Sequence, residues 1–175
     1  MVEYEDEGEG ATVPFRFKGM IEREIVKRLA EEQLAFSDCY LVDVTIKPGN
    51  LIVVEIDHDK AVGIDDCVSL SRYIEERIDR NIEDYELEVG SSGIGSPLKI
   101  VRQYVKNIGN EMEVLLKSGI KLRGELKAAD ENGITIAIGG GSRGSRGNGE
   151  ARGSDGDQSY TYGEIKNTKN IIRFK

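Results

Sequence analysis

The sequence predicts an α+β fold in two parts, a two-layer α-β-β-α-β domain followed by a small β-barrel. Apolar residues recur at helical spacing in two early segments, and after about residue 110 their spacing changes to two. The charge changes sign along the chain as well. Residues 20–99 carry eighteen acids and nine bases, whereas residues 100–175 carry nine acids and thirteen bases. A chain of 175 residues has room for one large or two small domains.

The first part of the chain begins with an acidic tail. Residues 1–19 place five acids among glycines, a composition typical of disordered segments. Helical periodicity starts directly after Met20, which makes Met20 a second candidate for the start of the protein. Ile21, Ile25 and Leu29 then share one helical face, and we expect this first helix to continue to about Phe36.

Residues 20–98 are expected to form the N-terminal α/β domain. Strands are predicted at Tyr40–Lys47 and Leu51–Asp57, and the second is so rich in Val and Ile that we expect burial on both faces. A second helix follows from Ile64 to about Asp79, and Tyr85–Val89 alternates as a third strand. Two amphipathic helices on three strands pack most simply on one face of the sheet, giving two layers.

The rest of the sequence predicts a short helix or hinge over residues 99–109 and a β-domain over residues 110–175. Five short strands are predicted there, which favours an SH3-like or Sm-like barrel. They are Glu111–Leu116, Leu122–Ala128, Ile134–Ile138, Tyr160–Tyr162 and Asn170–Phe174. The insert Gly139–Asp157 holds eight glycines and three arginines. It is interpreted as a flexible hairpin extension, the alternative being an arginine-glycine arm that orders on RNA.

Composition excludes several classes of protein. Cys39 and Cys67 are too few for a disulfide framework or a metal cage. No apolar run is long enough for a membrane span, and the first residues lack a secretory signal, so we expect a cytoplasmic protein with no membrane association. A net charge of −8 disfavours binding of nucleic acid over the whole surface. The opposite charges of the two halves suggest instead that the halves meet different partners.

The sequence shows no catalytic constellation. Gly90 and Gly95 have P-loop spacing, but Ser96 stands where the lysine must follow. The nucleophile motif of hydrolases fails around Ser92, because Ile94 stands where its second glycine must lie. His58, the only histidine, lies between two aspartates at a strand end and is expected to be a turn residue rather than a metal ligand or base. We therefore predict a binding protein, not an enzyme, with no cofactor and no metal.

The stretch Tyr85–Lys99 carries the most specific pattern: an alternating strand, a glycine-serine loop, then Pro-Leu-Lys. It resembles the signature of the RimP-type ribosome maturation factors, whose loop typically reads Ser-Ser-Pro-Gly-Leu-Asp-Arg-Pro-Leu-Lys. The matching residues are Ser91, Ser92, Pro97, Leu98 and Lys99. The family's proline, acidic residue and arginine are replaced by Gly93, Gly95 and Ser96. The resemblance covers roughly residues 20–138 and 159–175.

This resemblance implies the same two-domain fold and a function in ribosome assembly. Family members bind the immature free small (30S) ribosomal subunit and assist its late maturation. The implied partners are 16S rRNA and small-subunit proteins near the decoding centre, and we expect a monomer. The alternative that remains open is a protein-interaction adaptor with an Sm-like barrel that is not tied to ribosomes.

Two candidate binding surfaces follow. The first is the loop, whose small side chains can expose backbone N–H groups that hold a carbonyl or phosphate oxygen. The alternative is that the loop is only the tight turn that returns Leu98 to the core. Its candidate residues are Ser91, Ser92, Gly93, Gly95, Pro97 and Lys99.

The second candidate surface lies on the first hairpin of the β-domain. Its cations suit RNA phosphates or an acidic patch, although an ordinary outer strand face explains them nearly as well. They are Lys117, Lys121, Arg123 and Lys127, and a terminal cluster extends the same surface with Lys166, Lys169, Arg173 and Lys175.

Overall fold

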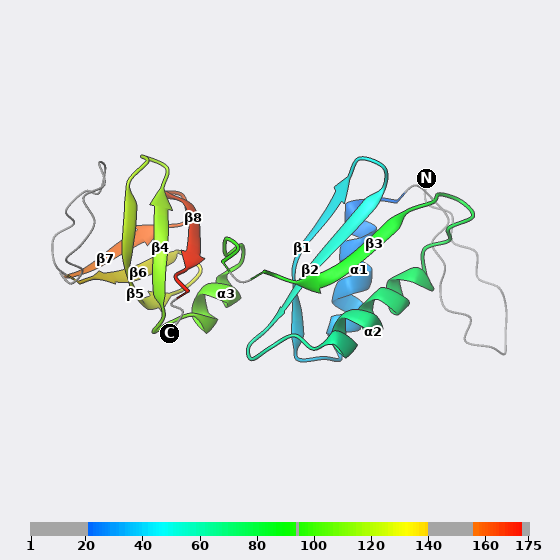
Figure 1. Cartoon of the computed structure of the whole chain (residues 1–175), viewed down its shortest axis with the longest axis horizontal. Coiled ribbons are helices and arrows are strands. Elements are labelled where there is room, and N and C mark those ends of the chain that lie inside the picture. Colours follow the sequence, from blue (N-terminus) through cyan, green and yellow to red (C-terminus); the bar gives the residue numbers. More distant parts are fainter. Residues whose placement is uncertain (1–20, 94, 140–155, 173–175) are drawn as a thin grey trace. The chain divides into compact units, whose positions relative to one another are not determined.

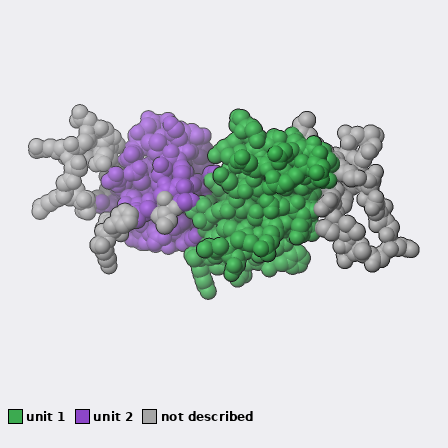
Figure 2. Space-filling model, turned by 45° about the vertical axis from the view of Figure 1, so that its right-hand side comes forward, with its two compact units in different colours: residues 1–92 green, residues 93–175 purple. Residues whose placement is uncertain are grey.

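The computed structural model describes residues 21–93, 95–139 and 156–172 (Figure 1). The predicted acidic tail and most of the predicted insert lie outside the described residues. The chain divides into two compact units, residues 1–92 and residues 93–175 (Figure 2). They are called unit 1 and unit 2 below, and each is described by itself.

Unit 1 has the predicted α-β-β-α-β order. Its elements are α1 (Arg23–Leu34), β1 (Cys39–Lys47), β2 (Leu51–His58), α2 (Ile64–Glu75) and β3 (Glu86–Ser91). The sheet order is β1-β2-β3, with β1 antiparallel and β3 parallel to β2. Because parallel neighbours need a long crossover connection, α2 returns the chain from the end of β2 to the start of β3.

Local chemistry sets the ends of these elements. Between β1 and β2 the chain turns through Gly49 (φ 85°) and Asn50 (φ 56°), two residue types that tolerate the left-handed region. At the start of α2, the Asp66 carboxylate accepts a hydrogen bond from the Gly63 N–H at 2.8 Å. This carboxylate satisfies a backbone donor and lies where the helix dipole favours negative charge.

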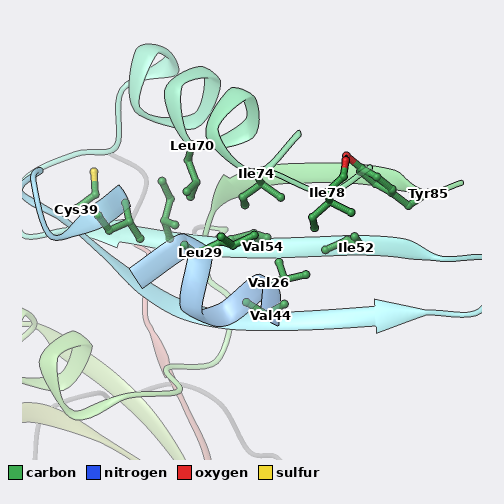
Figure 3. Close-up of a cluster of buried hydrophobic side chains, with 13 residues drawn as sticks. Val26, Leu29, Cys39, Val44, Ile52, Val54, Leu70, Ile74, Ile78 and Tyr85 are labelled. Atoms are coloured by element: carbon green, nitrogen blue, oxygen red, sulfur yellow. The ribbon is translucent and has the colours of Figure 1, made fainter. Parts of the chain in front are cut away.

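One hydrophobic core holds unit 1 together, and it combines both helices with a single face of the sheet (Figure 3). Leu29 of α1, Ile52 and Val54 of β2, and Leu70 and Ile74 of α2 are all 2 % exposed or less. Burying each such side chain contributes roughly 1.5–3 kcal/mol. Both helices therefore pack on the same face, as the sequence pattern predicts.

The expectation that β2 is buried on both faces is wrong. From Leu51 to Ile56 its residues alternate between half-buried and buried, with Leu51, Val53 and Glu55 on the half-buried side. The reason is that α1 and α2 contribute to one core on one face, so the apolar residues on the other face of β2 serve strand propensity rather than packing.

Unit 2 is a five-stranded antiparallel sheet preceded by a short helix. Its elements are α3 (Val101–Lys106), β4 (Glu111–Leu116), β5 (Lys121–Ala129), β6 (Gly133–Ile138), β7 (Gly156–Thr161) and β8 (Ile165–Asn170). The strand order is β7-β6-β5-β4-β8. Tyr104 of α3 packs into the core of this unit together with Met112, Leu126 and Ile136.

The last two strands differ from the prediction. β7 starts at Gly156, inside the segment predicted as an insert, and β8 ends at Asn170, where the last strand was expected to begin. Both strands are polar: β7 reads Gly-Asp-Gln-Ser-Tyr-Thr and β8 reads Ile-Lys-Asn-Thr-Lys-Asn. They are strands because each forms a backbone ladder with a neighbour, a contribution that an apolar alternation does not reveal.

Strand β5 passes from one neighbour to the other at Glu125, next to Gly124. Its first half pairs with β4 as far as Glu125, and from Glu125 onward it pairs with β6. A Cβ atom at Gly124 would overlap the backbone carbonyl of Ala137 on β6, so only glycine allows the two strands to approach this closely. Gly133 of β6 meets the carbonyl of Tyr160 on β7 in the same way.

The sheet is strongly curled. Its two edge strands, β7 and β8, are joined by only residues 162–164. Such a connection spans roughly 14 Å, whereas the edges of a flat five-stranded sheet lie about 19 Å apart. The sheet must therefore bend until its edges approach each other. Over the described residues no ladder joins β7 to β8, so the predicted closed barrel is not confirmed.

Within the part of the chain that the structure describes, no helix is long and apolar enough to cross a membrane.

Replacing Gly124 by alanine tests the close approach of β5 and β6. The added methyl group meets rigid backbone, so we expect a loss of about 2 kcal/mol or more. This corresponds to a fall of roughly 10 °C in the thermal midpoint of unit 2, measured by circular dichroism. Gly163→Ala is the matched control, because a Cβ atom there makes only an ordinary contact with Thr161. Equal midpoints for the two variants would contradict this account of the bend.

The connection between β6 and β7 gives a second prediction. Ile138 and Gly156 face each other as the last pair of the β6–β7 ladder. Replacing residues 139–155 by Asn-Gly, the strongest two-residue hairpin turn, should therefore preserve the ladder and the thermal midpoint. A shortened chain that loses its cooperative transition would show that the replaced residues stabilise unit 2.

Candidate functional site

The cations of the first hairpin in unit 2 lie around β5, as predicted. Lys121 and Arg123 project from the same exposed face, and Lys117 lies in the turn that joins β4 to β5. Lys127 follows near the end of β5 and is also exposed. The structure thus brings the four predicted cations onto one hairpin.

Glu113 of β4 lies among these cations and binds two of them. Its side chain is directly opposite Arg123 in the β4–β5 register. Its two carboxylate oxygens lie 3.2 Å from the Lys121 ammonium and 3.0 Å from the Arg123 guanidinium. Burial on its own raises the pKa of the Glu113 carboxyl, but hydrogen bonds from Lys121 and Arg123 and the charges of both lower that pKa by more.

The hairpin is consequently less positive than its four cations suggest. Lys127 forms its own ion pair with Glu125 at 2.7 Å. Among the described residues, only Lys117 of the four has no ion-pair partner. Exposed ion pairs add little stability, so a competing phosphate can displace the carboxylate at small cost.

The positive face continues onto β8. Lys169 lies directly opposite Glu113 on the other side of β4, so Lys169, Glu113 and Arg123 form a row across three strands. Directly opposed residues of an antiparallel pair share one face of the sheet. Lys169 of the terminal cluster therefore shares this sheet face, whereas Arg173 and Lys175 lie outside the described residues.

The other candidate surface, the glycine-serine loop, includes the residues at which the chain divides into the two units. Ser91 and Ser92 belong to unit 1, where the Ser92 N–H bonds the Ile56 carbonyl at 3.1 Å. In unit 2 the Ser96 N–H bonds the Gly93 carbonyl at 2.9 Å and closes a turn. Gly95 adopts φ 80° within this turn, which requires glycine.

These internal bonds favour a structural interpretation of the loop. The N–H groups of Ser92 and Ser96, which an anion would need, already have carbonyl partners. Pro97 is exposed, and Leu98 next to it packs against the core of unit 2 while its N–H bonds the Thr168 carbonyl at 2.9 Å. These bonds fit the tight turn that returns Leu98 to the core, the second of the two sequence-based alternatives, and binding of a partner by the loop stays a prediction.

Lys99 ends the loop and is fixed by a buried amide. The Gln103 side chain, only 1 % exposed, accepts hydrogen bonds from the N–H groups of Lys99 at 2.8 Å and Ile100 at 3.4 Å. Directly after α3, the side-chain amide of Asn107 donates a hydrogen bond to the backbone carbonyl of Gln103 at 2.7 Å. Lys99 is thereby held at the start of α3 with its side chain exposed.

Sequence reasoning missed Glu113, although the signal was present. A hairpin centred on Ser118 pairs residues that are equally far from the turn, and Glu113 and Arg123 are each five positions away. Combining the predicted turn with the spacing of the charges would have placed the acid between the bases.

His58 has a structural role that matches its predicted place in a turn. Its Nδ1 atom accepts hydrogen bonds from the N–H groups of Lys60 at 2.8 Å and Ala61 at 3.2 Å. The ring thus stabilises the chain between β2 and α2. Among the described residues there is no group of three or more His, Cys, Asp or Glu side chains placed to hold a metal ion.

Comparison with known proteins identifies the family. Residues 29–95 match the RimP N-terminal domain. A ribosome maturation factor RimP from Porphyromonas gingivalis is 47 % identical over 119 residues, which cover 68 % of this chain and 78 % of the relative. The factor of the same name from Christiangramia forsetii is 37 % identical over 116 residues, covering 66 % of this chain and 75 % of the relative.

A third relative, the ribosome maturation factor RimP from Flavobacterium psychrophilum, is 42 % identical over 93 residues, covering 53 % of this chain and 60 % of the relative. The first of these alignments extends beyond the matched N-terminal domain, since 119 residues exceed the length of unit 1. The chain therefore belongs to the RimP family.

Proposed function

We propose that this protein is a ribosome assembly factor that binds the immature free small ribosomal subunit and assists its late maturation. The observation that carries the proposal is the 47 % identity over 119 residues to a protein named as a ribosome maturation factor. Binding to the small subunit, and partners among 16S rRNA and the proteins near the decoding centre, are the finer parts of the proposal. They rest on the family resemblance of the loop at Ser91–Lys99. The proposal places the protein in the cytoplasm.

The contact surface in this proposal is the row of charges across β8, β4 and β5. Arg123 and Lys169 flank Glu113 on one sheet face, and Lys117 and Lys121 lie at the adjoining hairpin. Cations on a regular pair of strands suit RNA phosphates, because contacts to phosphates position a protein without depending on the base sequence. Phosphate contacts are weakened by salt and by competing charges, which suits a factor that must leave when assembly is complete.

The proposed action is binding without catalysis. In support, the Nδ1 atom of His58 accepts backbone hydrogen bonds from Lys60 and Ala61. The sequence around the loop serines Ser91 and Ser92 also contains no histidine that would activate them as nucleophiles. The loop contributes by fixing the start of unit 2 rather than by chemistry.

We further propose that unit 2 is an SH3-like or Sm-like barrel whose edges meet only near the turn at residues 162–164. The bend at Gly124 and the short connection between the two edge strands support this arrangement. Small barrels of this kind present hairpins and loops on a rigid frame, which suits a binding role.

Two variants with opposite expected effects test the contact surface. Changing four cations to glutamine should weaken cosedimentation with immature small subunits by about tenfold or more at low salt. The four are Lys117, Lys121, Arg123 and Lys127. Glu113→Gln releases two of these cations and should strengthen binding several-fold. Both variants should keep the parent thermal midpoint within a few degrees, because exposed ion pairs contribute little stability.

The control for these variants removes the same charge from unit 1. Four exposed or half-buried cations there are changed to glutamine: Lys27, Lys47, Lys60 and Arg72. This control should bind like the parent. If the quadruple glutamine variant of unit 2 and this control weaken binding equally, the effect is one of net charge and the hairpin is not the contact surface. Normal ribosome profiles in cells lacking the protein would instead favour an adaptor that is not tied to ribosomes.

A further inference from the structure

Unit 2 contains a groove of about 450 Å³, and none of the four hairpin cations lines it. Its walls are Leu98–Val101, Tyr104 of α3, Tyr162 from the turn that joins the edge strands, and Ile165–Asn167 of β8. These segments are far apart in the sequence and meet because the sheet curls. The volume lies within the range of pockets that hold small ligands.

The groove is built on a fixed frame. The Leu98 N–H bonds the Thr168 carbonyl at 2.9 Å, which ties the first wall to β8. The buried Gln103 side chain holds Lys99 and Ile100 through their backbone N–H groups. A groove whose walls share backbone hydrogen bonds needs little rearrangement to accept a ligand.

Two tyrosines give the groove an aromatic wall. The rings of Tyr104 and Tyr162 lie 5.2 Å apart at 62°, in edge-to-face contact. Tyr104 is only 5 % exposed, whereas Tyr162 is half-buried. The Tyr162 hydroxyl donates to the carbonyl of Asp130 at 2.8 Å, and Asp130 does not line this groove. The hydrogen bond at its hydroxyl and the contact with Tyr104 thus hold the Tyr162 ring in place. A ring held in this way can serve as a surface on which a base stacks.

The charge of the groove points to an anionic ligand. Lys99 and Lys166 are exposed on its walls, Asn167 adds an amide, and none of the lining residues is acidic. The two other described cavities of unit 2 each include a carboxylate, Asp130 in one and Glu111 in the other. A flat ring beside two ammonium groups is the combination that single-stranded nucleic acid uses, since each nucleotide offers a π-face and a phosphate.

We propose that this groove binds one unpaired nucleotide of single-stranded RNA, with the base stacked on Tyr162 and the flanking phosphates bound by Lys99 and Lys166. This inference rests on the proposed function, because it supplies a second RNA contact on unit 2. The groove would add a kind of recognition that phosphate contacts along the hairpin lack. Stacking requires an unpaired base, so the groove would select RNA that is not yet folded.

The test uses the full chain and a fluorescein-labelled oligouridylate RNA, with binding measured by fluorescence anisotropy. Tyr162→Leu removes the stacking ring and should weaken binding about tenfold. Tyr162→Phe keeps the ring and should bind within about twofold of the parent. Lys166→Gln should weaken binding and lower the slope of log affinity against log salt by about 0.7. Lys47→Gln, with the same charge change in unit 1, should alter neither quantity.

A second measurement does not depend on the folding of a variant. The parent chain is irradiated with an oligonucleotide that carries 5-iodouridine, and the adduct is located by mass spectrometry. The proposal expects the adduct on Tyr162 or Tyr104. An adduct confined to other residues, equal binding by Tyr162→Leu and the parent, or no oligonucleotide binding by the parent would each overturn the proposal. Displacement of the RNA by polyglutamate at equal charge would show that the groove takes an acidic peptide instead.

Cosedimentation with immature small subunits separates this inference from the proposed function. If the parent cosediments but the adduct lies outside the groove, the nucleotide site is wrong and the assembly role stands. If the parent does not cosediment, the proposed function fails, whatever the oligonucleotide shows.

Discussion

The close approach of β5 and β6 at Gly124 determines the shape of unit 2. Because no side chain separates Gly124 from the Ala137 carbonyl, β5 can leave β4 and join β6 within one strand. The sheet curls as a result, and three residues suffice to link its edges. The same curl brings Tyr162 and the start of β8 beside α3 and so forms the groove. A single missing Cβ atom thus underlies both the fold of the unit and its candidate ligand site.

An acidic residue reduces the positive charge of the sheet face that carries Arg123 and Lys169. Glu113 lies between Arg123 and Lys169 and lowers the positive potential where RNA would bind. A surface with fewer acids would bind RNA more tightly and release it more slowly. The ion pairs also hold the long side chains in place before contact, which reduces the entropy lost on binding. Both effects suit a factor that binds a particle for one stage of assembly and then leaves.

The sequence was most informative where apolar side chains alone decide the structure. The stripe of Leu70 and Ile74 predicted α2, and the alternation of Met112, Val114 and Leu116 predicted β4 with its observed bounds. Strands β7 and β8 were misplaced, because backbone ladders stabilise these polar segments and leave no periodic signal. The cations of the hairpin were found by their spacing. The groove was not, since Tyr104 and Tyr162 meet only after the sheet has curled.

The central claim is that unit 2 of this RimP-family protein docks on the immature small subunit. Hydrogen exchange of the full chain, measured with and without purified immature subunits, tests it most directly because every described backbone amide reports its own protection. We expect slower exchange in the turn between β4 and β5 and in the segments around Lys99 and Tyr162 when the particle is present. Protection confined to unit 1, with the exchange of unit 2 unchanged, would contradict it.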